Sequence, residues 1–213
     1  MGNKGKTGCG CLLFILVICM IFTGALIHPF SLKLIARQMR HADKIVPADI
    51  IFVHRFAEDK SGELYTDAFR EYWAGNGKAI YVEEDKIFGA SIQDVIAKMS
   101  KTRGIKENIV RAIDVPDGEE NVKVNKIKEK IRAMGYKKVI VLVPEYASKR
   151  FHLLYGASQD KDKVFYIIKP VEVSYFRKDA WWKDNTSRMV FLKEAYDTGS
   201  YYVSGLTGWG TKK

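Results

Sequence analysis

Cysteine is nearly missing from this chain of 213 residues, and the three cysteines present, Cys9, Cys11 and Cys19, all lie close to the N-terminus. The longer part of the chain after them therefore offers no thiolate, which excludes metal sites built on cysteine from that part. The same distribution is compatible with export to an oxidising compartment, where a free thiol has no advantage.

Complete catalytic motifs are missing as well. Ser148 has no His and Asp partners at a spacing typical of a hydrolase triad. Residues 2–7 (GNKGKT) resemble part of a phosphate-binding loop, but they lack its first glycine at full spacing and follow no strand. We find no internal repeat and no low-complexity region. The sequence therefore leaves open whether the protein is an enzyme.

Positive charge is in excess, with a formal net charge of +10, but the excess is not spread over the chain. It lies mainly in residues 1–47 and in the last two lysines, on either side of the rest of the chain. No stripe of Arg and Lys with interleaved aromatic residues appears on one element, which argues against a nucleic-acid partner. Basic side chains beside a membrane gain about 1 kcal/mol each from anionic lipid, so the pattern favours a membrane partner.

One long apolar run occupies residues 11–27 (CLLFILVICMIFTGALI), directly behind Lys4 and Lys6. Crossing a bilayer takes about 20 apolar residues, with a lower limit of about 17. We therefore expect a basic leader (1–10), a transmembrane anchor (11–30) and a basic juxtamembrane helix (31–47). A cleaved signal peptide is the alternative, because Thr23, Gly24 and Ala25 form a small-residue site. The flanking charges alone slightly favour a domain on the cytoplasmic side.

Short apolar runs alternate with helical patterns from residue 48 to about 200, which is typical of βαβ units and a parallel sheet. The pattern predicts one α/β domain over 48–200 with about five strands, of which 138–143 should be central and 109–113 outer. The tail, 201–213, is rich in glycine and predicted to be flexible. The expected strands are 48–54, 78–82, 109–113, 138–143 and 164–168, and the expected helices are 63–75, 91–103, 123–134, 145–156 and 187–197.

Polar side chains follow three of the predicted strands, and the carboxyl ends of parallel strands meet at one edge, where ligands bind in open α/β sheets. Three interpretations stay open. Basic side chains could hold an anionic sugar or phosphate group. His54 with Glu83, Asp85 or Glu145 could hold a divalent cation. Alternatively, these are ordinary loop charges that pair with each other. The candidate residues are His54, Arg55, Glu58, Asp59, Glu83, Glu84, Asp85, Glu145, Lys149 and Arg150.

Several segments together resemble the YdcF/SanA/ElyC-like family of bacterial envelope proteins. They are residues 41–53 (HADKIVPADIIFV), the helix ending at 72–75, the strand 139–143 (VIVLV) leading into 144–156 (PEYASKRFHLLYG), and the Trp181-Trp182 pair before a final helix. The resemblance implies a Rossmann-like three-layer sandwich behind an N-terminal membrane anchor. It also implies a single-pass protein of the inner membrane with its domain facing the periplasm or cell exterior.

The resemblance is one of architecture more than of motif. The family's glycine-rich loop after the first strand is replaced by His54-Arg55, and its Ser-Gly-Gly turn after the second by Glu83-Glu84-Asp85. In its Tyr-His-x-x-Arg segment, Tyr146 and Arg150 match and the histidine is lost. The position at the strand ends predicts a ligand site at Arg55, Glu83, Tyr146, Lys149 and Arg150, and the resemblance supports Tyr146 and Arg150 within it.

Two functions follow as expectations. The first is a membrane-anchored envelope protein that binds a small anionic or nucleotide-like ligand, or a cell-envelope precursor, and maintains the envelope. The second is a catalytically inactive scaffold that contacts a membrane-protein partner through residues 30–44 and the tail. The changed glycines and the lost histidine favour the second. Trp181 and Trp182 are expected to close a core, with stacking on a sugar or an interfacial position as alternatives.

Overall fold

A computed structural model of the protein describes residues 7–87, 89–156 and 164–207. Its centre is a five-stranded sheet in which every neighbouring pair of strands is parallel, in the order β5-β2-β1-β6-β7. The α/β class and the parallel sheet are thus confirmed. The strands are β1 (Ile50–Val53), β2 (Ile80–Glu83), β5 (Val110–Ile113), β6 (Lys138–Pro144) and β7 (Phe165–Val171).

The strand in the middle of the sheet is β1, flanked by β2 and β6. The expectation that residues 138–143 form the central strand is therefore wrong by one position, although β6 is an interior strand. β5 lies at an edge, as expected for an outer strand. All four residues of β1 are fully buried, which explains their continuous hydrophobicity, because a parallel strand is covered on both faces.

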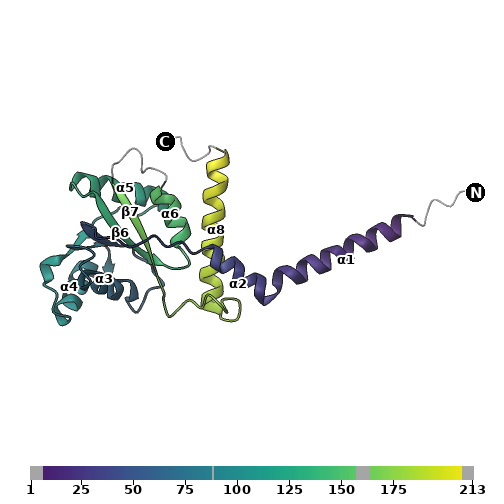
Figure 1. Ribbon diagram of the computed structural model, residues 1–213, viewed down its shortest axis with the longest axis horizontal. Coiled ribbons are helices and arrows are strands. Elements are labelled where there is room, and N and C mark those ends of the chain that lie inside the picture. Colours follow the sequence, from purple (N-terminus) through teal and green to yellow (C-terminus); the bar gives the residue numbers. More distant parts are fainter. Residues whose placement is uncertain (1–6, 88, 157–163, 208–213) are drawn as a thin grey trace, which may run out of the picture.

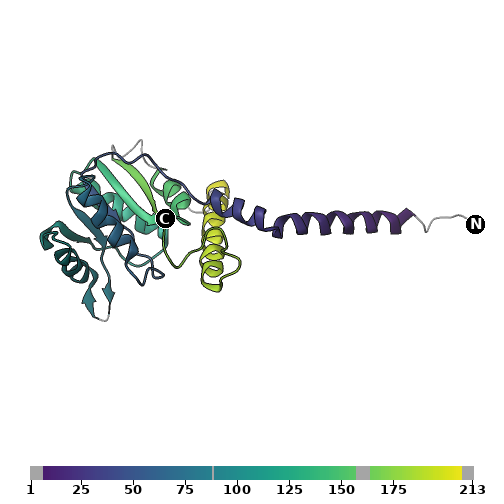
Figure 2. The same ribbon diagram turned by 60° about the horizontal axis from the view of Figure 1, so that its bottom comes forward.

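Helices cover both faces of the sheet and produce three layers (Figures 1 and 2). One face carries α3 (Glu63–Trp73), which contacts four of the strands, and α4 (Ile92–Thr102), which contacts β5. The other face carries α5 (Glu120–Ala133) and α6 (Ser148–Gly156), with α6 against β6 and β7. A small hairpin, β3 (Lys86–Ile87) with β4 (Ala90–Ser91), and a 3-10 turn, η1 (Glu107–Ile109), were not expected.

The N-terminal part extends away from the sandwich as α1 (Thr7–Ile27), followed by α2 (Pro29–Gln38) (Figure 1). His28 caps α2 through Nδ1, which accepts from the Phe30 amide at 3.3 Å, and Pro29 begins the helix. Among the described residues, no single helix has both the length and the hydropathy to cross a bilayer. Only the bent pair of α1 and α2, with 62° between them, has the required length and composition.

The segment after α2 is not helical, so the helix expected over 31–47 ends early, at Gln38. The reason is a competing set of hydrogen bonds with the outer edge of β7. The Asp43 amide donates to the Ile168 carbonyl at 3.1 Å, and the Ile168 amide donates to Asp43 Oδ2 at 2.8 Å. These bonds satisfy backbone groups of an edge strand and hold residues 39–49 in an extended path towards β1.

The last helix, α8 (Asn185–Thr207), is longer than the predicted 187–197 and includes part of the tail expected to be flexible. Residues 208–213 of that tail lie outside the described residues. Asp184 accepts from the Ser187 amide at 2.8 Å and so caps α8. Trp181 is buried, stacks on Phe191 at 3.8 Å and donates from Nε1 to the Leu32 carbonyl at 3.0 Å. It therefore joins α2 to α8.

Gly77 precedes β2 where the chain passes very close to β1. A Cβ at this position would lie 2.6 Å from Ile51 Cγ1, and Ile51 is fully buried. We expect Gly77→Ala to lower the free energy of unfolding by about 1–3 kcal/mol, because the added methyl forces buried atoms apart. Denaturant unfolding of the full chain in detergent measures this effect. Gly118→Ala, where a Cβ meets nothing within 4 Å, is the control and should be close to neutral.

Candidate functional site at the carboxyl ends of the strands

The residues that directly follow β1 and end β2 form one buried polar network. His54 Nδ1 lies 3.3 Å from Glu83 Oε2, and His54 Nε2 lies 2.7 Å from the Tyr155 hydroxyl of α6. Glu83 also accepts from the Arg55 amide at 3.3 Å and from Lys123 Nζ, on α5, at 3.1 Å. His54 and Glu83 are both buried. The sequence placed these two at the same sheet edge, and the structure brings them into contact.

The protonation states in this network follow from its surroundings. Burial raises the pKa of the Tyr155 hydroxyl well above its ordinary value, so this group stays protonated. Because the Glu83 carboxylate can only accept, His54 Nδ1 is the donor in their hydrogen bond. Burial alone would raise the pKa of Glu83, but the hydrogen bond and charge of His54, together with Lys123, lower it to about 2. Glu83 is therefore a stable carboxylate, and a proton-transfer role near neutral pH does not suit it.

Arg55, one of the expected anion ligands, forms an ion pair with Asp85. This pair is partly exposed and occupies the loops directly after β1 and β2. Asp85 was a candidate cation ligand, and in the structure it is used by a guanidinium instead. Anion binding by Arg55 and cation binding by Asp85 would therefore each compete with the ion pair between these two residues.

Tyr146 and Arg150, the two residues that match the family's segment after β6, are buried. The Tyr146 hydroxyl lies 3.3 Å from that of Tyr175, and burial raises its pKa well above the ordinary value. Arg150 donates through Nε and Nη2 to the two carboxylate oxygens of Glu194, at 2.7 and 2.9 Å. This two-pronged pair joins α6 to α8. Lys149, at the start of α6, is partly buried, and its amide donates to the Met39 carbonyl at 3.1 Å.

Glu145 follows β6 and pairs with residues outside the His54 network. Its carboxylate lies 3.3 Å from Lys178 Nζ and 3.9 Å from Arg40 Nε. Burial raises its pKa, with Lys178 acting in the opposite direction. Glu145 and Lys178 line a shallow hollow of about 550 Å³ beyond the end of β7. A second hollow, of about 440 Å³, lies beside Asp67 and Lys169. Neither is lined by Arg55, Glu83, Tyr146 or Arg150.

The arrangement agrees best with the third interpretation of the sequence, in which the charges at the strand ends pair with each other. Neither of these two hollows brings the expected anion and cation ligands together. Within the described ranges, one group of His and carboxylate side chains has the spacing of a metal site, and it consists of His41, Asp43 and His152. Sequence reasoning missed it because residues 41 and 152 are far apart in the chain and no local motif joins them.

The Glu83 network predicts a specific acid sensitivity. Its folded pKa of about 2 lies below the ordinary 4.5, so its contribution to stability is present above about pH 4.5 and is lost as the pH falls towards 2. The difference corresponds to about 3 kcal/mol. We expect the stability advantage of the wild type over Glu83→Gln to shrink across this range in denaturant unfolding. The exposed Glu129→Gln is the control, and a wild-type advantage that stays constant down to pH 2 would contradict the assignment.

The Arg150–Glu194 pair predicts a different outcome for single and double substitutions. Arg150→Met leaves the buried Glu194 carboxylate without its partner, which should cost about 3–5 kcal/mol in the free energy of unfolding. The double variant Arg150→Met/Glu194→Leu removes both charges and should recover most of that loss. Equal losses in the two variants would show that the pair is not what holds α8 on α6.

Comparisons of the chain with models of protein families, with curated proteins and with solved structures gave no match.

Proposed function

We propose that this protein is a membrane-tethered interaction scaffold that acts by binding a membrane-protein partner, and that it does not process a small ligand at its strand ends. The observation that carries the proposal is an exposed apolar face on α8, beside the helices that lead to the membrane. The charged side chains at the strand ends, by contrast, mostly pair with other residues of the same molecule.

The outer face of α8 carries apolar side chains at the spacing of a heptad repeat. Met189, Leu192, Tyr196 and Val203 are between 53 % and 74 % exposed, and Gly199 occupies the one intervening position of the pattern. Positions separated by three, four and seven residues share one side of a helix. The opposite side of α8 is buried on the domain through Val190, Phe191 and Glu194. An apolar face of this length that stays exposed in the described part of the domain is typical of a partner-binding surface.

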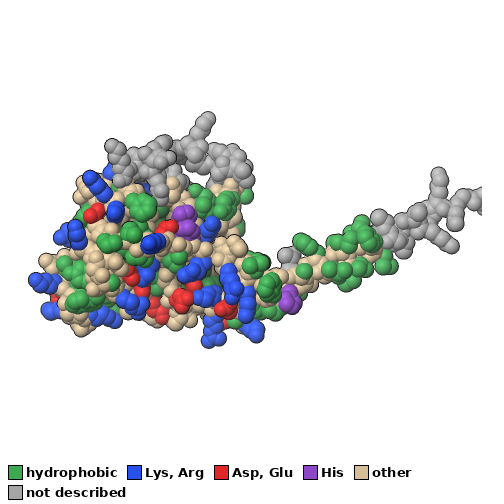
Figure 3. All heavy atoms as spheres, in the orientation of Figure 1, with side chains coloured by type: hydrophobic (Ala, Val, Ile, Leu, Met, Phe, Trp, Pro, Cys, Tyr) green, Lys and Arg blue, Asp and Glu red, His purple; other side chains and the backbone are tan. Residues whose placement is uncertain are grey.

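The apolar surface of α1 supports a membrane tether. Its large apolar side chains from Leu12 to Phe22 are exposed, and Figure 3 shows hydrophobic side chains along this helix. Exposing such a surface to water is costly, at about 25 cal/mol per Å², and lipid removes that cost. Basic residues follow at once, with Arg37, Arg40 and Lys44 exposed, where anionic lipid attracts them. α1 is thus proposed as a single-pass anchor in the inner membrane, with α2 joining it to the domain.

The position of α8 fits this arrangement. α8 lies on the side of the sandwich from which α2 and α1 depart (Figure 1), and Arg37 of α2 lies 3.6 Å from Asp179 in the loop before α8. A partner that crosses the membrane next to the anchor would therefore meet the outer face of α8. We further propose that the chain is a divergent member of the YdcF/SanA/ElyC-like family with its domain in the periplasm or outside the cell. The anchor and the parallel five-stranded sandwich support this.

Binding of a small anionic or nucleotide-like ligand is the alternative function. The structure supports it less, because the guanidinium groups of Arg55 and Arg150 already bind carboxylates. A ligand at these residues would have to displace both internal pairs.

Site-specific photocrosslinking in cells tests the scaffold function. A benzophenone side chain at Tyr196 should give crosslinks to one or a few membrane proteins. The same probe at Val122, an exposed apolar position on α5, should not. Crosslinks from position 196 only to lipid, or only to a second copy of the chain, would contradict the proposal.

The same full-length protein, purified in detergent, provides a second readout. A ligand that binds only the folded state raises the melting temperature. Nucleotides and sugar phosphates should therefore leave the melting temperature of this protein unchanged if it does not bind them. A concentration-dependent increase that Arg55→Gln abolishes would instead favour the small-ligand alternative.

A further inference from the structure

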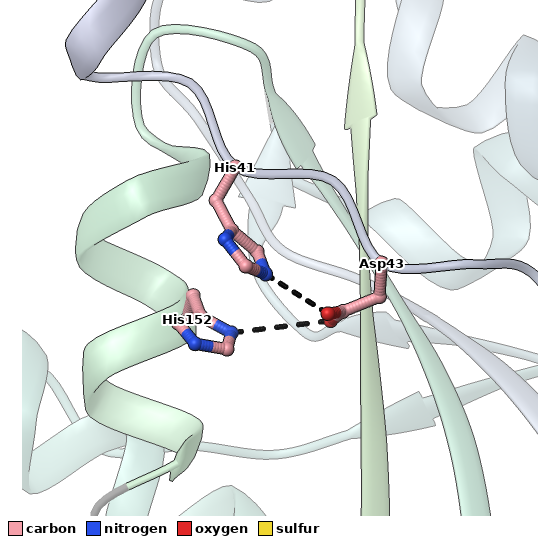
Figure 4. Close-up of side chains that lie close together, drawn as sticks. All are labelled: His41, Asp43 and His152. Carbon is pink, nitrogen blue, oxygen red and sulfur yellow. Dashed lines mark hydrogen bonds and ion pairs between the residues drawn. The ribbon is translucent and has the colours of Figure 1, made fainter.

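A group of two histidines and one aspartate lies where the segment between α2 and β1, residues 39–49 and here called the anchor segment, crosses the domain. His41 and Asp43 belong to the extended segment after α2, and His152 lies on α6. Both imidazoles point towards the Asp43 carboxylate (Figure 4). His41 Nε2 is 2.9 Å from Oδ1, and His152 Nδ1 is 3.9 Å from Oδ2. The three ligand atoms all lie within 4.8 Å of one another.

These distances suit a common metal ion. With metal–nitrogen and metal–oxygen bonds of about 2.0–2.2 Å, two ligands of a tetrahedral ion are about 3.4 Å apart. The separations in the group bracket this value. Because the two rings are stacked at 26° to each other, both imidazoles have to rotate about their side-chain bonds to direct their lone pairs at one ion. Two imidazoles and one carboxylate are a donor set suited to zinc and to neighbouring divalent transition metals. The strongly oxygen-preferring magnesium and calcium ions suit it less.

The backbone around the group is held in place before any ion binds. Asp43 Oδ2 accepts from the Ile168 amide at 2.8 Å, which fixes the orientation of the carboxylate. The His41 amide donates to Ser148 Oγ at 2.8 Å, and Ser148 Oγ donates to the Glu145 carbonyl at 2.8 Å. The anchor segment and α6 are thus connected at the point where their ligands meet. Pre-positioned ligands lose less entropy on binding an ion, which favours affinity.

The group is also accessible. The side chains of His41, Asp43 and His152 are 25 %, 27 % and 35 % exposed, so an ion can enter from solvent. Three protein ligands leave a fourth tetrahedral position, which water can fill. The two imidazole rings are stacked, with centroids 3.6 Å apart. In this geometry both rings direct a nitrogen to the same side, towards the carboxylate.

We propose that His41, Asp43 and His152 bind one divalent transition-metal ion of the zinc type. The ion would be ligated by His41 Nε2, His152 Nδ1 and the Asp43 carboxylate, with water at the open position. Because two ligands belong to the anchor segment and one to α6, the bound ion fastens the membrane-proximal segment to the domain. This site is independent of the apolar face of α8.

Metal titration of the full-length protein in detergent, purified with a histidine-free tag, tests the site. Isothermal titration with ZnCl2 should give one ion per chain, and CoCl2 should give the visible absorption of a four-coordinate cobalt ion. Zinc should also raise the melting temperature. His41→Gln and His152→Gln should each weaken binding by at least about tenfold. Neither change removes a backbone hydrogen bond, and circular dichroism checks that both variants fold.

His28→Asn is the matched control. His28 is an exposed histidine near the same segment, and asparagine can still cap α2. This variant should bind zinc as the wild type does. Absence of binding by the wild type would overturn the proposal. So would equal binding by the wild type, His41→Gln and His152→Gln, because the ion would then lie elsewhere.

Discussion

Burial of the middle strands on both faces is the constraint on which the rest of this structure depends. β1 and most of β6 are fully enclosed, so helices must cover both sides of the sheet and the polar groups of the connecting loops must collect at its two ends. At the carboxyl ends of the strands, these polar groups include His54, Glu83, Arg55 and Asp85. Their positions follow from the topology, whereas their function depends on the partners they find there.

Those partners are mostly within the molecule. The Glu83 carboxylate, which could repel an anion or bind a cation, is neutralised by Lys123 and oriented by His54. Glu194 on α8 forms an ion pair with Arg150 on α6 in the same way. Charges paired in this way add to cohesion between elements, because separating them would leave buried groups uncompensated. The surfaces that remain available to other molecules lie away from the strand ends, on α8 and along the anchor segment.

The sequence predicted the elements of the sandwich well, because hydrophobic runs such as residues 138–143 and helical stripes are local signals. It also placed His54 and Glu83 at the same edge of the sheet, where the structure brings them into contact. Contacts between residues far apart in the sequence could not be predicted from it. The middle position of β1, the early end of α2 at Gln38 and the pairing of Arg150 with Glu194 depend on tertiary neighbours. Helix α8 was predicted too short because its glycines suggested a flexible tail, whereas packing on the domain stabilises it.

The hydrogen bonds of Asp43 with Ile168 have a consequence for any shortened form of the protein. β7 is an edge strand, and the anchor segment covers part of its outer side. A soluble fragment that begins after residue 44 would leave these backbone groups open to pairing with another molecule. Self-association of such a fragment would then reflect the missing segment, and its oligomeric state would not represent that of the intact chain.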